Sequence, residues 1–257
     1  MKDSQIYVAK CPQRQLNRCA FFDVQLVDTD RGSKLDPSWL VPSAPNDDCF
    51  IKKSGIWAYI TPDLEAKVKH EVEVCEQLIL YPHPNVAIYR GCQVANSRVV
   101  GIRYRKYRET LINIVNPEGL NKGAFVRRGQ RAIDKAVKQS IIDGIEGAIR
   151  HLHSLNLIYN DITPMNIMLD TNLTWILIDF VSCRKIGESL EGVKRTYGWY
   201  DPAITTTTEQ NDWDTLAELK VWLLGILVHD FIFIEGWVAR LCFKLLQVIG
   251  CVIMASL

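Results

Sequence analysis

Apolar positions recur with a helical period in three segments of the chain. In residues 140–155 they are Ile141, Ile142, Ile145, Ala148, Ile149 and Leu152. Such spacing places them on one face of a helix, which we expect to be buried. A charged helix is predicted over residues 64–80. A third, apolar helix is predicted to open at Asn211 and to continue through Leu216, Leu219, Trp222 and Leu223.

Short apolar runs predict strands between these helices. Residues 49–52 and 98–102 are two of them. Residues 166–169 and 175–178 form a predicted hairpin, because Asp170-Thr171-Asn172 supplies turn-forming side chains between them. This hairpin is expected to bring Asn166 and Asp179 to neighbouring strand ends, facing one cleft.

Composition indicates a globular chain. Its 257 residues suit one or two domains, and 48% hydrophobic with 23% charged residues allows a sizeable core. The net charge of +1 argues against a nucleic-acid binder, which needs a basic face. The eight cysteines include no Cys-x-x-Cys pair, and free thiols favour a reducing compartment. No long apolar run follows Met1–Gln5, so we expect an intracellular, cytoplasmic protein.

The C-terminal stretch 221–257 is strongly apolar. Its last uncharged run, residues 245–257, has 13 residues, fewer than the roughly 20 that span a membrane. One or two buried helices are the leading interpretation. There are two alternatives: this stretch forms an interfacial helix that touches a membrane, or it is a gene-model artefact.

Two acids and an amide surround the predicted hairpin. Asp161 lies in the run Tyr159–Asn166, Asn166 follows five residues later, and Asp179 thirteen residues after that. Carboxylate and amide oxygens suit Mg²⁺, and phosphoryl transfer depends mainly on positioning and on metal ligands. The competing interpretation is a set of ordinary turn residues around Pro164.

The run Tyr159–Asn166 with Asp179-Phe180 resembles the catalytic loop and Asp-Phe-Gly segment of eukaryotic protein kinases. The resemblance implies that Asp161 orients or deprotonates the acceptor hydroxyl. It implies that Asn166 holds one Mg²⁺ ion and that Asp179 bridges the metals and the ATP phosphates. Thr196 opens a segment, through Ala203, that is similar to the substrate-binding turn of these enzymes, and it stands where family members carry a threonine that contacts the catalytic acid.

Upstream residues extend the resemblance to the nucleotide. Lys52 matches the lysine that touches the nucleotide phosphates, and Glu71, 19 residues later, matches its partner on the following helix. Lys53 competes with Lys52, because strand alternation directs only one of them to the cleft. The segment 105–107 is the implied hinge, so main-chain groups around Lys106 and Tyr107 are expected to meet adenine.

Two residues near the loop have expected supporting roles. Either Asp212 or Asp214 braces the catalytic-loop backbone, and Asp212 is the favoured choice. An aspartate that caps the helix explains the same position equally well. His153 is interpreted as a partly buried histidine with its hydrogen bonds satisfied.

The resemblance covers residues 49–224 and implies an α+β, two-lobed protein-kinase-like fold. A β-rich N-lobe is expected at 20–104 and a helical C-lobe at 105–224, with a cleft between them. Residues 1–19 precede the lobes and an apolar helical tail, 225–257, follows them. Because so little chain remains after Lys220, the C-lobe is expected to be truncated.

The closest resemblance is to divergent fungal protein-kinase-like proteins. It rests on Asn160-Asp161, Pro82–Asn85 and Asn211–Leu216. Several positions depart from the kinase pattern: no Gly-x-Gly-x-x-Gly precedes Lys52, and Asn160, Thr163, Val181 and Ala203 replace an arginine, a lysine, a glycine and a glutamate.

Three functions follow from this pattern. The first is a protein kinase that transfers phosphate from MgATP to Ser or Thr of an unidentified protein. The second is a pseudokinase or scaffold that binds nucleotide weakly or not at all, which the departures favour. The third is a small-molecule phosphotransferase, against which the turn at 196–202 argues, because it resembles a platform for a protein substrate.

Overall fold

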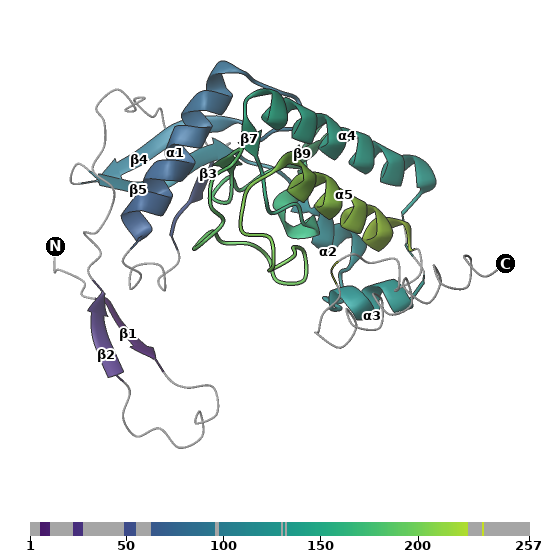
Figure 1. Ribbon diagram of the computed structural model, residues 1–257, viewed down its shortest axis with the longest axis horizontal. Coiled ribbons are helices and arrows are strands. Elements are labelled where there is room, and N and C mark those ends of the chain that lie inside the picture. Colours follow the sequence, from purple (N-terminus) through teal and green to yellow (C-terminus); the bar gives the residue numbers. More distant parts are fainter. Residues whose placement is uncertain are drawn as a thin grey trace, which may run out of the picture. The chain divides into compact units, whose positions relative to one another are not determined.

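The computed structural model describes residues 6–10, 23–27, 49–54, 63–95, 98–129, 131, 133–225 and 233. The chain divides into two compact units. Unit 1 is residues 1–82 with 87–106, and unit 2 is residues 83–86 with 107–257 (Figure 1). The predicted domain boundaries, and the predicted cleft between two lobes, remain predictions.

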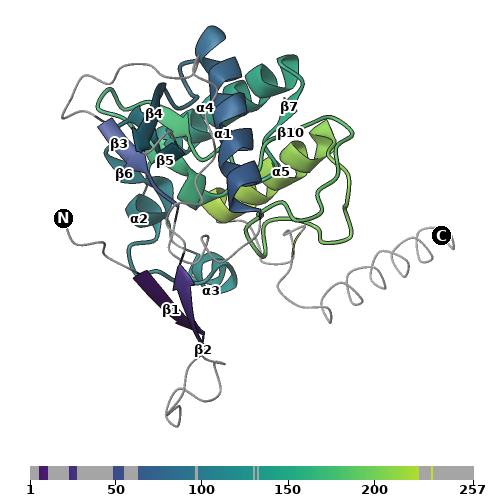
Figure 2. The same ribbon diagram turned by 90° about the vertical axis from the view of Figure 1, so that its left-hand side faces the viewer.

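Unit 1 is built on an antiparallel sheet. Its strands are β3 (Cys49–Lys52), β4 (Tyr89–Ala95) and β5 (Arg98–Arg105), in the order β3-β5-β4 (Figure 2). In this sheet Lys52 lies opposite Ile102. Two further strands, β1 (Ile6–Lys10) and β2 (Asp23–Val27), pair with each other as a separate two-stranded sheet.

One helix, α1 (Leu64–Leu80), packs on this sheet and has the bounds of the charged helix predicted from the sequence. Its buried positions are Leu64, Glu71, Val72, Val74, Cys75 and Leu78. Glu71 is the charged member of that face. A buried charge is costly without a partner, so this position predicts an ion pair or hydrogen bonds nearby.

Unit 2 contains the remaining described helices. They are α2 (Leu111–Val115), α3 (Lys122–Arg127), α4 (Lys135–Ser154) and α5 (Glu209–Leu224). Helix α4 starts five residues before the predicted segment, and every apolar position predicted for its buried face is buried. Figures 1 and 2 show α4 and α5 side by side, and their residues are in contact.

Short strands carry the loops of unit 2. Strands β6 (Glu109–Thr110), β8 (Ile167–Leu169) and β9 (Trp175–Leu177) form one sheet, and β7 (Leu157–Ile158) pairs with β10 (Arg184–Lys185). The predicted hairpin is β8-β9. Its turn is closed by Asp170, whose Oδ1 accepts the N–H groups of Asn172 at 2.7 Å and Thr174 at 2.9 Å.

The start of α5 corrects one interpretation. The helix begins at Glu209, and Thr208 is its N-cap residue, so Asp212 does not cap it. It ends at Gly225, which adopts a left-handed conformation with φ of 77°. Glycine meets no steric penalty there, and this is a common way to end a helix.

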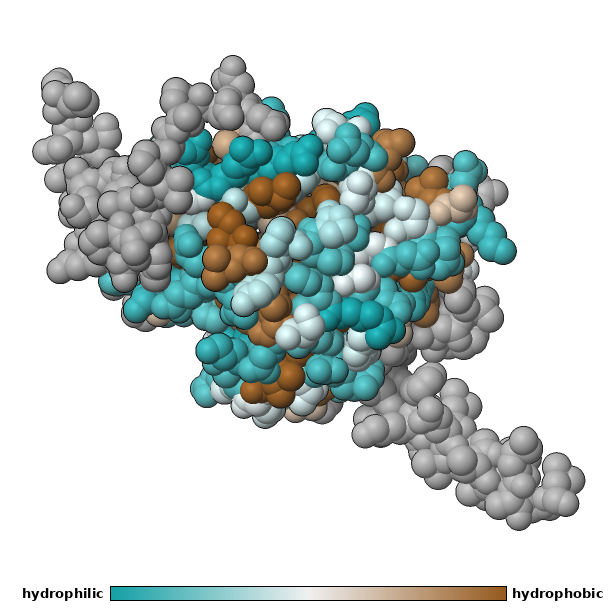
Figure 3. Space-filling view, turned by 90° about the horizontal axis from the view of Figure 1, so that it is seen from above, coloured by the Kyte–Doolittle hydropathy of each residue, from teal (hydrophilic) through white to brown (hydrophobic). Residues whose placement is uncertain are grey.

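Several predictions concern residues outside the described ranges. They are the segment 1–19 apart from Ile6–Lys10, the stretch 28–48 in which no Gly-x-Gly-x-x-Gly is present, and the tail 225–257 apart from Gly225 and Phe233. Among the described helices, none is long and apolar enough to cross a membrane. The face in Figure 3 is mostly hydrophilic, with separate hydrophobic patches.

Candidate active site

A buried carboxylate on α5 fixes the loop that carries Asp161. Asp212 is fully buried, and its two oxygens accept the main-chain N–H groups of Tyr159 at 2.8 Å and Asn160 at 2.7 Å. His153 Nε2 lies 2.8 Å from Asp212 Oδ2. Of the two aspartates considered from the sequence, Asp212 therefore braces the loop, and His153 is a hydrogen-bonded, largely buried histidine.

Asn160 ties the same loop to two other segments. Its backbone is left-handed, with φ of 64°, a conformation that asparagine adopts more readily than most residues. Its side-chain N–H group donates to the carbonyls of Ile158 at 3.0 Å and Ser182 at 3.3 Å, and its Oδ1 accepts from Asn211 at 3.1 Å. Neutral hydrogen bonds thus hold a position where the kinase pattern has an arginine.

Asp161 is in direct contact with two other predicted site residues of unit 2. Asp161 Oδ1 accepts the main-chain N–H of Thr196 at 2.7 Å. Asn166 Nδ2 donates to both the carbonyl oxygen and Oδ2 of Asp161, each at 3.0 Å. These bonds fix the orientation of the carboxylate.

Burial changes the acidity of Asp161. It raises the pKa of the Asp161 carboxyl, and the nearby Asp179 carboxylate adds to the rise, while the hydrogen bonds from Thr196 and Asn166 oppose it. A carboxylate with a raised pKa is a stronger proton acceptor than an exposed aspartate.

Asp179 joins this group through the β8-β9 hairpin. Asn166 immediately precedes β8, and its carbonyl accepts the N–H of Ile178, the residue before Asp179, at 2.9 Å. Asp179 has a left-handed φ of 60°, a costly conformation that tends to occur at functional sites. Its Oδ2 lies 3.6 Å from Lys194 Nζ.

The donor set suits Mg²⁺ bound together with phosphate. Among the described residues no group of three or more His, Cys, Asp or Glu could hold a metal by itself. Asp179 and Asn166 supply a carboxylate and an amide oxygen. Magnesium usually takes one or two protein oxygens and completes its shell with water and substrate phosphates, so the residues fit that ion.

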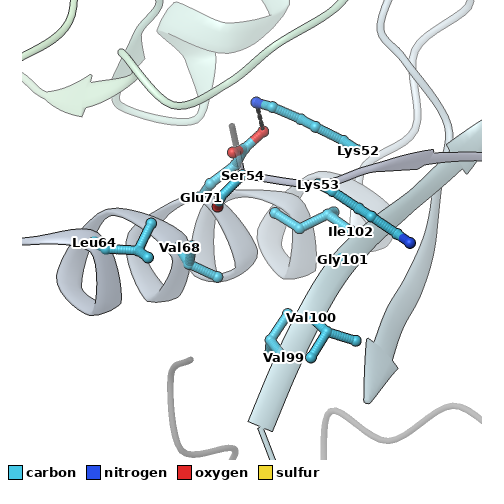
Figure 4. A pocket seen from close by; sticks show the side chains of 10 residues that line it. All are labelled: Lys52, Lys53, Ser54, Leu64, Val68, Glu71, Val99, Val100, Gly101 and Ile102. Atoms are coloured by element: carbon cyan, nitrogen blue, oxygen red, sulfur yellow. Dashed lines mark hydrogen bonds and ion pairs between the residues drawn. The ribbon is translucent and has the colours of Figure 1, made fainter. Parts of the chain in front are cut away.

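Unit 1 holds the predicted lysine and glutamate together. Lys52 Nζ lies 2.6 Å from Glu71 Oε1. In Figure 4 the Lys52 side chain extends to Glu71, whereas Lys53 points away from it. Lys52 is thus the residue that forms the pair, and the side chains of Lys52 and Glu71 are 28% and 5% exposed.

Tyr104 also bonds this ion pair, and it was not predicted from the sequence. The Tyr104 hydroxyl donates to the same Glu71 oxygen at 3.0 Å and lies 3.1 Å from Cys75 Sγ. Burial, then the neighbouring Cys75 and Glu71, raise the pKa of Tyr104 well above its usual value, so the phenol keeps the proton that it donates. Strand alternation could have indicated this contact. Tyr104 lies two residues after Ile102, the partner of Lys52, so the side chains of Tyr104 and Ile102 lie on the same face of the sheet.

A hollow lies beside the ion pair in unit 1 (Figure 4). Leu64 and Val68 of α1 and Val99 of β5 line it together with Lys52 and Lys53. Its volume is about 510 Å³ when the space open to solvent is counted. The side chain that pairs with Glu71 therefore belongs to a residue that lines accessible space.

The predicted hinge, residues 105–107, begins at the end of β5. Arg105 is the last residue of β5, and its main-chain N–H is already bonded to the carbonyl of Ile88 at 2.9 Å. Exposed Lys106 and buried Tyr107 follow in irregular backbone, Lys106 in unit 1 and Tyr107 in unit 2.

Comparisons with known proteins agree with this geometry. The family model for the protein kinase domain matches residues 52–238, more than half of the chain. The chain is 29% identical over 167 residues to mouse myosin-IIIb, covering 64% of this chain and 12% of that protein. It is 30% identical over 88 residues to the rat serine/threonine-protein kinase Sgk2, covering 34% of this chain and 23% of the relative. The matches thus span less than a quarter of these relatives.

A solved structure shares the fold. One chain in the crystal structure of the yeast RNA Pol II CTD kinase CTDK-1 complex matches with a TM-score of 0.54 and 18% identity, covering 73% of this chain and 57% of that one. The predicted α+β protein-kinase-like fold, with strands first and helices later, is confirmed.

Proposed function

Because the chain belongs to the protein kinase domain family, we propose that it transfers a phosphoryl group from MgATP to a Ser or Thr hydroxyl of a protein. The observation that carries this proposal is the fixed carboxylate of Asp161, which accepts from Thr196 and Asn166 on a loop anchored by Asp212. Relatives named as serine/threonine kinases support the acceptor class.

Each predicted site residue has a separate proposed role. Asp161 orients the acceptor hydroxyl and takes its proton, as its raised pKa permits. Asn166 and Asp179 hold Mg²⁺, which when bound neutralises charge on the phosphates. In unit 1, Lys52 binds phosphate oxygens and Glu71 keeps its ammonium group in place.

Thr196 and the following turn provide the surface for the protein substrate. Tyr197 is 75% exposed, so an aromatic side chain is available next to the residue that bonds Asp161. Lys106 and Tyr107 are proposed to offer main-chain groups to adenine. From the sequence we further infer a cytoplasmic, fungal-type protein with lobes at 20–104 and 105–224.

The test combines binding with transfer. MgATP at 100 times its dissociation constant should stabilise the protein by about 2.7 kcal/mol in thermal unfolding. Phosphate transfer to a generic protein, or to the chain itself, should fall at least about a hundredfold in Asp161→Asn. The matched control, Asp143→Asn, changes an exposed aspartate on α4 and should transfer normally.

The pH profile gives an independent check. Transfer requires ionised Asp161, and burial raises the pKa of this group. Activity should therefore decline, as pH falls, at a higher pH than an ordinary carboxyl group would give. ATP binding without transfer would support a pseudokinase instead, and transfer only to small alcohols would support a small-molecule phosphotransferase. Phosphate transfer that persists in Asp161→Asn would refute the assignment of Asp161 as the proton acceptor.

A further inference from the structure

We propose that a buried ion pair between Lys122 of α3 and Glu218 of α5 positions the turn 196–199 against Asp161. This inference rests on the proposed function, because the turn is the surface suggested for a protein substrate. Lys122 and Glu218 are therefore positioning residues that act through the turn.

The Lys122–Glu218 pair is buried, and Lys122 bonds the turn 196–199. The side chains of Lys122 and Glu218 are 6% and 0% exposed, and Lys122 Nζ bonds Glu218 Oε1. The same ammonium group donates to the carbonyl of Gly198 at 2.7 Å and to that of Phe233 at 3.3 Å. It also lies 4.5 Å from the ring centroid of Trp199.

Aromatic packing supports the same turn from α5. The Trp199 ring meets Trp222 edge-on with centroids 6.3 Å apart, and Trp222 stacks on Phe125 of α3 at 4.5 Å. Thr215 Oγ1, which donates to the Asn211 carbonyl at 2.7 Å, lies 3.4 Å from the Trp199 carbonyl oxygen. The turn thus rests on α3 and α5, with Lys122 as the cation among these contacts.

The turn transmits this position to Asp161. The N–H of Trp199 donates to the Thr196 carbonyl at 3.0 Å, and the N–H of Thr196 donates to Asp161 Oδ1 at 2.7 Å. Helix α5 also carries Asp212, which holds the loop on which Asp161 lies. One helix therefore sets both the loop and the turn that meet at this carboxylate.

The chemistry of the pair favours positioning over stability alone. Burying two charges costs desolvation energy, so well-packed apolar residues often stabilise a fold equally well. Apolar residues cannot donate to the Gly198 carbonyl, however. In the kinase pattern a glutamate anchors the activation segment, and Ala203 stands in its place here. Lys122 supplies an anchor for this segment from a different element.

The test replaces the pair by apolar residues and follows the turn directly. In Lys122→Met/Glu218→Leu, hydrogen exchange of the Thr196 and Trp199 amides should accelerate about tenfold, as expected when a hydrogen bond from a charged donor is lost. Exchange in the middle of α4 should not change. The control Arg128→Met breaks the exposed pair with Glu118 beside α3 and should leave the turn unaffected.

Kinetics separate positioning from a general structural effect. In the double variant the KM for a protein substrate should rise about tenfold, whereas the KM for ATP stays unchanged. Hydrogen exchange decides the inference even if the wild-type chain transfers no phosphate, a result that would overturn only the proposed function. If the double variant does not fold, Glu218→Gln, which removes the carboxylate from Lys122, should also accelerate exchange at the turn. Unchanged exchange at Thr196 and Trp199 in a folded variant would overturn the inference.

Discussion

The two units hold their central charged groups in different ways. In unit 2, Asp161 lies on a loop whose main-chain N–H groups are bonded to a fully buried Asp212. In unit 1, Lys52 pairs with the side chain of Glu71, which the Tyr104 hydroxyl also bonds. The position of Asp161 is thus set by the backbone, whereas that of Lys52 depends on side-chain conformation and on the placement of α1.

This difference indicates where the protein can respond to a ligand. Asp161 is 4% exposed, so its surroundings cannot rearrange without disturbing the core of unit 2. The Lys52 side chain is 28% exposed and borders the hollow in unit 1. A shift of α1 would carry Glu71 away from Lys52 while leaving the sheet intact. We therefore expect damage to the anchor in unit 2 to affect stability, and damage in unit 1 to affect binding.

The largest effect is expected at Asp212. Asp212→Ala removes the acceptor of two main-chain N–H groups and the partner of His153, all in buried positions. Leaving buried donors unsatisfied should lower the free energy of unfolding by about 3–5 kcal/mol. Urea denaturation followed by tryptophan fluorescence measures this loss.

Asp214 provides the matched control for this experiment. It lies two residues further along α5, is half-buried, and accepts from Gln210 Nε2 one turn away at 2.7 Å. Asp214→Ala should cost about 0.5 kcal/mol or less. Equal losses in the two variants would show that the loop is not anchored through Asp212, and the contrast between the units would disappear.

The sequence predicted those parts of the molecule that depend on local patterns. The period of apolar residues predicted the buried face of α4. Asp161, Asn166 and Asp179 lie close enough in the chain for one loop and one hairpin to connect them. Asp212 could be chosen over Asp214 only by resemblance, since both lie at the start of the same helix.

The contacts that sequence reasoning missed join distant segments. Tyr104 and Glu71 are 33 residues apart, and Lys122 and Glu218 are 96 apart. A glutamate within the apolar face of a helix predicts that a partner lies nearby. Which residue this partner is depends on the tertiary packing, which the sequence pattern does not show. The same applies to Arg105, whose N–H donates to the carbonyl of Ile88, 17 residues earlier in the chain.

An intermediate effect is expected at Tyr104. Tyr104→Phe removes one of the two donors to Glu71 Oε1 and should lower the free energy of unfolding by about 1 kcal/mol. Because Glu71 then holds Lys52 less firmly, MgATP should bind about three- to fivefold more weakly by titration calorimetry.

Tyr89 separates stability from binding in this test. It is a buried tyrosine of the same sheet, and its hydroxyl donates to Glu76 Oε1 at 2.8 Å, not to Glu71. Tyr89→Phe should cost a similar amount of stability, about 1 kcal/mol, and leave MgATP affinity unchanged. If both variants weaken MgATP binding equally, Tyr104 acts through the stability of unit 1 and has no special link to Lys52.

The smallest effect is expected at Lys194, where unit 2 has an ion pair that is more exposed than the Lys52–Glu71 pair. Lys194 is 65% exposed, and its Nζ lies 3.6 Å from Asp179 Oδ2. Removing it by Lys194→Met takes a competing cation from the proposed metal ligand. Mg²⁺ affinity in the presence of ADP should therefore rise, but by no more than about fivefold, the limit for an exposed pair.

Salt and a second lysine show whether this effect is electrostatic. Lys185→Met removes an exposed charge from β10, in the same segment of unit 2, and should leave Mg²⁺ affinity unchanged. In about 1 M salt the difference between Lys194→Met and the wild type should shrink, because screening weakens exposed pairs most. A rise of tenfold or more, insensitive to salt, would mean that Lys194 closes the site. Asp179 would then depend on a side chain as Lys52 does, and the contrast between the units would hold only for Asp161.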